Sequence, residues 1–507
     1  MSRNAARITS LPLLLGVLAL VPATPAWASD QEPAATGSEE PGDTEDDALR
    51  ERLTEREDKR RPLEPWSVQV AGRPLIVGGE IEIVQDSLRR FPVDDPARRV
   101  NRSLSAQELE VEAFYSLGRP LSLFAQVRTG IEEVLRPDTS ATVSNRFVER
   151  GEMWLYSEHI AGSNLSLDLG RLDFEDDRRW WWDEELDAIR VEYEAERFDL
   201  ALAFARELAP SRSDRDFVDP QHDRVHRVIA EASWGWRRNH VLQLFALHQD
   251  DRSHREFPGR VVQLDREDES DARLTWVGAR LMGGIDFGAH GMLGYWLDAA
   301  QVRGKEHLAE FETLDWNSFP VQQSIVASVS QQDVRGWAMD AGLNWILPLA
   351  WEPRLIAGIA FGTGDRNSDD GADYAFRQTG LHANEAGFGG VQRYGHYGVL
   401  LDPELSNLQV LTFGAGLTLL QSSSLDLVHH RYRLVEPATS LRDARLDVAL
   451  TGTHRELGSG IDAVLALEEW ERFEFEFVAA AFRAGPAFGS AEGSWSYGGF
   501  LALRIAF

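Results

Sequence analysis

The chain has 507 residues, a formal net charge of −30 and no cysteine. The absence of cysteine excludes disulfides, thiol catalysis and a lipoprotein anchor, so stability must come from burial or backbone pairing. The length is compatible with several soluble domains or with one large barrel. We find no motif for an enzyme, and we expect no catalytic residue, cofactor, metal site or nucleic-acid partner.

The N-terminus has the organisation of a secretory signal. Arg3 and Arg7 precede the apolar run LPLLLGVLAL, and Ala26-Trp27-Ala28 offers small residues to signal peptidase. This predicts a signal peptide over residues 1–28. Residues 29–65 are rich in charge, Pro, Gly and Ser, and we expect a disordered acidic tail there. Because no later uncharged apolar run reaches about 18 residues, the sequence predicts no transmembrane helix.

From residue 66 onward, apolar and polar side chains alternate with a period of two. The pattern is clear in QELEVEAFYSL (107–117), PLSLFAQVRTGI (120–131) and RGWAMDAGLNWIL (335–347). Such alternation indicates strands with one apolar and one polar face.

Short and long connections alternate between these strands. Tight turns are expected at 118–120, 162–164, 196–197, 237–239, 347–351, 421–424 and 469–471, and long connections at 89–106, 136–149, 208–224, 250–271, 304–333 and 363–392. This arrangement is typical of an outer-membrane barrel, and residues 66–507 predict an all-β, transmembrane antiparallel barrel of about eighteen strands. Both chain ends then lie on the periplasmic side with the short turns. A soluble protein such as a propeller is the alternative, but no repeat of blade length is visible.

The C-terminal segment YGGFLALRIAF alternates and ends in an aromatic residue, Phe507. This ending resembles the signal that the barrel assembly machinery recognises in bacterial outer-membrane proteins. A closed barrel also satisfies every backbone donor and acceptor in lipid, because it has no free edge.

Three consecutive tryptophans, Trp180, Trp181 and Trp182, occupy the link RRWWWDEE between strands expected at 164–174 and 187–195. We expect this link at the extracellular rim. The rings could form part of an interfacial aromatic girdle, or turn inward and line the mouth as sugar-stacking surfaces. Because successive side chains on a strand alternate, at least one ring should face the lumen or pack under a loop.

Three segments resemble the alginate export family of outer-membrane barrels. They are GRLDFEDDRRWWWDEELDAIR (170–190), Phe376–Thr412, and the pair GSGIDAVLALEEW (458–470) and AAAFRAGPAFG (479–489). The resemblance implies an eighteen-stranded monomer whose lumen passes an anionic uronate polymer from the periplasm to the cell surface. It also implies that lumen arginines and their acidic partners line the path: Arg171, Arg190, Arg377 and Arg393, held by Asp173 and Asp187.

The polar parity of the strands adds Arg128 and Arg354 to the residues expected on the path. Arginine suits a polyuronate because its planar fork binds carboxylates in a bidentate manner and stays charged. Other inward positions are acidic, however: Glu80, Glu82, Glu108, Glu110, Glu112, Glu192, Glu194, Glu474 and Glu476. In the family as the resemblance describes it, the penultimate strand carries arginines where this chain has Glu474 and Glu476. Unpaired, these carboxylates would repel a polyanion.

The strand pattern predicts an integral outer-membrane barrel, and the family resemblance implies a channel for passive export of an alginate-like, anionic exopolysaccharide. Its expected partners are this polymer, outer-membrane lipid, the barrel assembly machinery and a periplasmic export scaffold. Two other functions stay open: a general porin or uptake channel with a mixed-charge lumen, and a non-conducting surface barrel that acts as an adhesin or receptor.

Overall fold

A computed structural model describes residues 66–91, 100–118, 120–136, 141–253, 256–314, 323–367, 370–445, 449–470 and 472–507. The expected signal peptide (1–28) and acidic tail (29–65) lie outside these ranges. No helix in the described part of the chain is long and apolar enough to cross a membrane.

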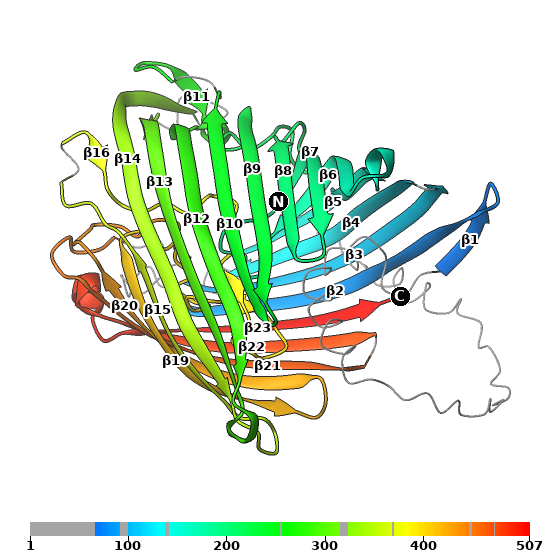
Figure 1. The fold of residues 1–507 in the computed structure, drawn as a ribbon. Coiled ribbons are helices and arrows are strands. Elements are labelled where there is room, and N and C mark those ends of the chain that lie inside the picture. Colours follow the sequence, from blue (N-terminus) through cyan, green and yellow to red (C-terminus); the bar gives the residue numbers. More distant parts are fainter. Residues whose placement is uncertain are drawn as a thin grey trace, which may run out of the picture. The chain divides into compact units, whose positions relative to one another are not determined.

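One antiparallel sheet closes on itself to form a barrel of 18 strands (Figure 1). The ring closes where β2 pairs with β23, from Glu80↔Ala506 to Arg89↔Tyr497. The expected strand number and fold class are confirmed. The barrel strands are β2 (Arg73–Phe91), β3 (Val100–Gly118), β4 (Leu121–Arg136), β5 (Ala141–Ser157), β6 (Leu165–Glu175), β7 (Asp183–Ala195), β8 (Phe198–Ala205), β9 (Val225–Arg237), β10 (His240–Asp251), β12 (Ser270–Asp286), β13 (Met292–Thr313), β14 (Gln323–Ile346), β15 (Arg354–Gly362), β19 (Leu408–Leu419), β20 (Ser423–Leu434), β21 (Glu456–Trp470), β22 (Phe473–Ala484) and β23 (Trp495–Ala506).

The two faces of the barrel wall differ as the alternation predicts. On β14, Leu343 is 47% exposed on the outer face, whereas Asp340 is 1% exposed on the inner face. On β15, Leu355 faces outward and the neighbouring Arg354 is buried inside. A strand in a membrane barrel needs this arrangement, because lipid accepts apolar side chains and the lumen accepts charge. The inward parity expected for Arg128, Arg354, Glu110 and Glu476 is confirmed.

Short turns gather at one end of the barrel, together with the start of β2 and the end of β23. Three of the expected long connections are wrong, because strands occupy most of their residues. Residues 89–91 and 100–106 belong to β2 and β3, residues 136–149 belong mostly to β5, and most of 304–333 belongs to β13 and β14, which run from 292 to 313 and from 323 to 346. In each case polar side chains continue past the apolar belt, so the strands extend beyond the apolar signal in the sequence. A short turn at residues 287–291 was not foreseen.

A hairpin extends the periplasmic end of the barrel. Among the residues that the structure describes, strand β1 (Trp66–Val70) pairs with β2 alone, from Trp66↔Val77 to Val70↔Arg73. Ala71 and Gly72 form its tight turn with φ of 50° and 80°, as a two-residue turn with positive φ requires. The remaining short elements are η2 (Ile160–Gly162), β11 (Val261–Gln263), η3 (Leu264–Arg266), η4 (Gly288–His290), β16 (Ala372–Asp373), β17 (Glu385–Ala386), β18 (Tyr394–Gly395) and η5 (Pro486–Ala491).

Candidate functional site: a plug inside the barrel

The tips of β6 and β7 leave the barrel wall. β6 pairs with β5 only over Leu167–Arg171, and β7 pairs with β8 only from Ala188 onward. Between these limits the two strands pair with each other alone. At the bend, Gly170 has φ of 146°, and a Cβ there would lie 2.0 Å from the carbonyl oxygen of Met153. Glycine therefore permits the close approach at which the hairpin turns into the lumen.

The β8–β9 connection closes the gap that this hairpin leaves in the wall. Arg150 N donates to Ser211 O at 2.9 Å, and Ser213 N donates to Val148 O at 2.8 Å. The guanidinium of Arg150 also makes two hydrogen bonds to the Asp187 carboxylate, at 2.7 and 2.9 Å. Asp187, at the base of the hairpin, is thereby fixed to β5. A bidentate pair of this kind defines both distance and orientation.

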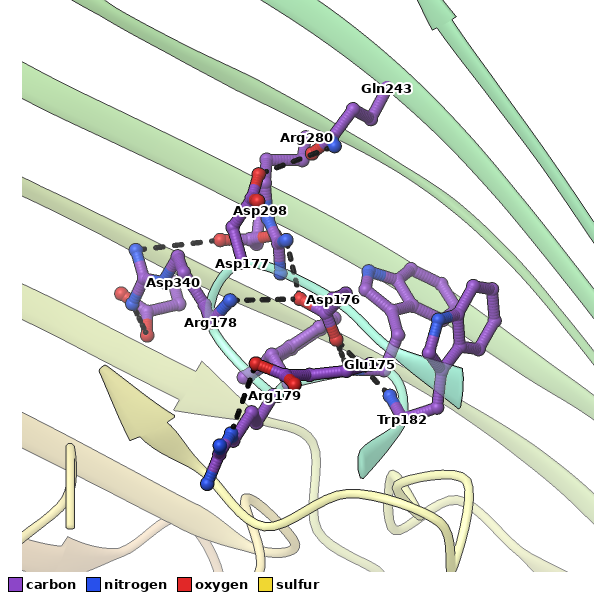
Figure 2. A network of polar contacts seen from close by, with 12 residues as sticks. Glu175, Asp176, Asp177, Arg178, Arg179, Trp182, Gln243, Arg280, Asp298 and Asp340 are labelled. Carbon is purple, nitrogen blue, oxygen red and sulfur yellow. Dashed lines mark hydrogen bonds and ion pairs between the residues drawn. The ribbon is translucent and has the colours of Figure 1, made fainter. Parts of the chain in front are cut away.

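Asp176 organises the link between β6 and β7 (Figure 2). Its Oδ2 accepts hydrogen bonds from the backbone N–H groups of Trp181 and Trp182, at 2.7 and 3.1 Å. Its Oδ1 lies 2.5 Å from Arg280 Nη1 on β12. Arg280 Nε donates to Asp298 on β13 at 2.6 Å. The link is thus folded back on itself and tied to the far wall of the barrel.

Arg178 extends the same network to β14. Its guanidinium lies 3.0 Å from Asp340 and 3.5 Å from Asp298 (Figure 2). It also lies 4.6 Å from the centre of the Trp296 ring. Trp296 Nε1 and the Tyr397 hydroxyl both donate to Asp340, each at 2.8 Å. Charges this deeply buried persist only when they are paired and hydrogen-bonded.

The second part of the site comes from the long connection between β15 and β19. Gln378 Nε2 donates to Trp180 O at 3.1 Å, and Asn384 N donates to Arg179 O at 2.9 Å. The Arg179 side chain forms an ion pair with Glu385 at 2.5 Å. We call residues 171–187 and 373–407 together the plug, because both segments lie inside the barrel and bond to each other.

The three tryptophans lie within the plug, not at the rim. They are only 3%, 1% and 2% exposed. Trp181 stacks on Phe245 at 4.9 Å between ring centres, Trp180 stacks on Phe376 at 6.1 Å, and Trp180 Nε1 donates to the Tyr397 hydroxyl at 2.7 Å. The expected mouth position is wrong, because Asp176 turns the link inward. The expectation that at least one ring packs under a loop is met by all three.

Each arginine expected on the path is paired with a carboxylate. Arg171 Nε lies 3.2 Å from Glu185, which Arg128 also contacts. Arg190 Nε lies 3.1 Å from Asp168, and its Nη1 donates to the main-chain oxygen of Asp173 at 3.1 Å. The remaining pairs are Arg354 with Asp426 at 2.9 Å, Arg377 with Glu306 at 2.5 Å and with Asp373 at 2.6 Å, and Arg393 with Glu175.

These pairings differ from the expected ones in two respects. The carboxylate of Asp187 holds Arg150 rather than one of the four family-type arginines. In addition, these four arginines do not share the same acidic partners. Arg377 contacts Glu306 on β13, whereas Arg190 contacts Asp168 within the β6–β7 hairpin. The arginines are therefore distributed around the plug and neutralised locally.

A cavity that is open to solvent lies between the plug and the wall formed by β5–β9. Arg190 projects into it beside the aromatic side chains of Trp154 and Phe174. A concave site with aromatic surfaces and a few oriented polar groups is typical of small-ligand and sugar binding. The lining residues are Glu152, Trp154, Asp168, Asp173, Phe174, Glu175, Trp182, Arg190, Ala201, Ala203, Ile229 and Glu231.

Sequence reasoning missed the residues that anchor the plug: Arg150, Asp176, Arg178, Arg280, Asp298, Glu306 and Asp340. A signal was present for part of this set. Arg280, Asp298 and Asp340 interrupt otherwise apolar strands at inward positions, and a charge buried in a barrel needs a partner. The alternation itself cannot say which loop supplies that partner.

A closed antiparallel barrel with an apolar outer face and a charged interior defines this protein as an integral β-barrel of the outer membrane. The family model described as Alginate export matches residues 95–498, and the chain belongs to this family.

Two curated relatives are both named alginate production protein AlgE. The protein from Pseudomonas aeruginosa is 26% identical over 319 residues, which are 62% of each chain. The protein from Pseudomonas syringae pv. tomato is 24% identical over 369 residues, which are 69% of this chain and 67% of the relative. The chain thus spans about three fifths of the length of the first of these relatives.

Two solved barrels from Pseudomonas aeruginosa share the fold. OccK7 (OpdD) has a TM-score of 0.51 at 12% identity, covering 85% of this chain and 99% of its own. OccK5 (OpdH) has a TM-score of 0.50 at 10% identity, covering 85% and 98%. At these identities the likeness shows the barrel fold alone.

Proposed function

We propose that this protein is a channel through which an alginate-like, anionic exopolysaccharide diffuses from the periplasm to the cell surface. One observation carries the proposal. The two longest segments that resemble the alginate export family, residues 170–190 and 376–412, supply most of the plug and bond to each other inside the lumen. The named relatives support alginate as the model substrate. Alginate export is a transport family rather than an enzyme family.

In this proposal the polymer threads along the cavity between the plug and β5–β9. Arg190 would meet a uronate carboxylate, since its guanidinium is positioned by Asp168 and by the Asp173 carbonyl. Trp154 and Phe174 would contact the apolar faces of the sugar rings. The remaining carboxylates of the cavity would accept hydrogen bonds from sugar hydroxyls, because ionised Asp and Glu are acceptors only.

Planar-bilayer recording tests this path. Uronate oligomers added to the periplasmic side should interrupt the current more often than neutral glucans of equal length. Arg190→Gln should shorten these interruptions at least several-fold. Arg303→Gln, a matched change on the exposed face of β13, should leave them unchanged. Equal interruption by neutral glucans would favour the general porin or uptake channel, and absence of any current would favour the adhesin or receptor.

Several partners belong to the same proposal. Outer-membrane lipid would surround the apolar face, and the barrel assembly machinery would recognise the C-terminal strand that ends in Phe507. A periplasmic scaffold would deliver the polymer to the side of the short turns. We propose that the barrel works as a monomer, because the ring closes within one chain.

A further inference from the structure

The periplasmic half of the lumen is acidic along one side. Seven glutamates line the inner faces of β2, β3 and β22, and we call them the acidic wall: Glu80, Glu82, Glu108, Glu110, Glu112, Glu474 and Glu476. Glu80 stands directly opposite Glu110 in the sheet, and Glu82 stands opposite Glu108. Like charges at directly opposed positions destabilise a sheet. The arrangement therefore has no rationale in the stability of the barrel.

Arg504 is the positive group nearest the centre of the acidic wall. Its guanidinium nitrogens lie 2.9 Å from Glu82, 3.7 Å from Glu474, 3.9 Å from Glu476 and 4.0 Å from Glu80. Arg504, on β23, thus contacts four carboxylates, two on β2 and two on β22, which are the strands on either side of it. Its single charge cannot neutralise them.

Arg128 reaches the wall from β4, where its Nε lies 3.4 Å from Glu110. The same guanidinium also contacts Glu185 of the plug. Further along the inner face, on β7, Arg190 is paired with Asp168, and Glu192 lies 3.1 Å from its Nε. Arg504, Arg128 and Arg190 are therefore already matched by carboxylates, and the acidic wall keeps an excess of negative charge.

The acidic wall is in contact with water. The side chains of Glu80 and Glu82 are 31% exposed and that of Glu474 is 46% exposed, although all three point inward. The charged pairs that anchor the plug lie deeper: Asp176 of the plug is 4% exposed and Asp298, on the β13 wall beside it, is 0% exposed. The lumen is thus open at the periplasmic end and filled further out, so a solute from the periplasm meets the acidic wall before it meets the plug.

We infer that the acidic wall makes the channel prefer cations over anions, and that an anionic polymer passes it with its carboxylates screened by mobile cations. Low-dielectric walls focus the field of fixed charges into a pore. Salt weakens this field over a screening length of roughly 8 Å at physiological ionic strength. The first half of the inference concerns small ions alone, and the second half rests on the proposed function.

Reversal potentials in a KCl gradient test the first half. The parent channel should show a cation preference of several-fold. A triple variant, Glu82→Gln with Glu110→Gln and Glu474→Gln, should lower this preference by at least half. Arg504→Gln should raise it, and Glu196→Gln, in the exposed β7–β8 turn, should not change it. Anion preference in a parent channel with the heat-resistant mobility of a folded barrel would overturn the inference.

Salt dependence tests the second half. Interruption of the current by uronate oligomers should become more frequent as KCl is raised, and the triple variant should flatten this dependence. A parent channel in which uronate interrupts the current equally at low and high salt would overturn it. Cation preference without any uronate interruption would refute the proposed polyuronate substrate and leave the inference about small ions in place.

Discussion

Asp176 Oδ1, in the link between β6 and β7, lies 2.5 Å from Arg280 Nη1 on β12, and neither side chain is exposed. The pair joins the inward hairpin to the opposite wall of the barrel. Removing one partner of a buried ion pair leaves the other charge uncompensated. This lowers the stability of the fold more than replacing both partners with apolar residues does. The position of the plug therefore depends on charges that must be present together.

Replacing Arg280 with Met should destabilise the folded barrel by about 3–5 kcal/mol, because Asp176 and Asp298 would lose their shared partner in a buried site. Denaturant unfolding in detergent micelles measures this change. The exposed pair Arg431–Glu456 is the control, and Arg431→Gln should cost less than about 1 kcal/mol.

The coupling of the pair can be measured directly. Asp176→Asn combined with Arg280→Met should destabilise the barrel by less than the sum of the two single changes. The reason is that the double variant contains one fewer unpaired charge than Arg280→Met alone. Strict additivity would show that the two side chains do not stabilise each other.

Replacing Trp181 with Ala should cost about 3–5 kcal/mol and loosen the plug, because a buried indole packed against Phe245 would leave a cavity. The readout is the same unfolding experiment together with the single-channel conductance, which should rise. Trp234→Ala removes an indole from the outer, exposed face and should change neither quantity appreciably. Equal effects of both substitutions would place Trp181 outside the plug.

The two segments of the plug should be linkable by a disulfide, because Asp183 N donates to Leu381 O at 2.5 Å and the chain contains no cysteine. In Asp183→Cys with Leu381→Cys, mild oxidation should give a species whose electrophoretic mobility reverts on reduction. Asp183→Cys with Leu349→Cys, the latter in a periplasmic turn, should give none. Failure of the first pair would contradict the contact between the two segments.

Lowering the pH should separate the connection that follows β15 from the connection between β20 and β21. Arg366 and Arg455 both hold Glu436, at 2.6 Å each, and the hydrogen bond from Arg366 keeps the pKa of Glu436 below its ordinary value. Because the folded-state pKa is lowered, this contact contributes above the unfolded-state pKa and is lost as the pH falls through the lowered value. Hydrogen-exchange protection of residues 363–367 and 449–455 should drop over that window. Glu436→Gln should remove the pH dependence, and an unchanged pH profile in this variant would contradict the assignment.

The barrel wall could be predicted from the sequence because its pattern is local. A period of two places Leu343 outside and Asp340 inside whatever the remainder of the chain does. Strand number, inward positions and the side of the short turns follow from that period. Strand ends such as Thr313 on β13 were misplaced, because beyond the apolar belt both faces are polar and the alternation disappears.

The plug could not be predicted in the same way. Its partners are distant in the sequence: Asp176 meets Arg280, and Arg393 meets Glu175. A strand-like backbone was also expected at Trp180–Trp182, whereas Asp176 binds the N–H groups of residues 181 and 182 and makes a compact turn. Local hydrogen bonds from an Asp side chain compete with strand pairing, and they decided the direction of this link.

Release of fluorescent uronate oligomers from liposomes that contain the purified barrel tests the central claim most directly. We predict that uronate oligomers leave protein-containing liposomes much faster than protein-free ones, and faster than neutral glucans of the same length. Oxidation of the Asp183→Cys, Leu381→Cys variant should not stop release, because the proposed path runs beside the plug. Retention of uronate oligomers while neutral glucans escape would contradict the account.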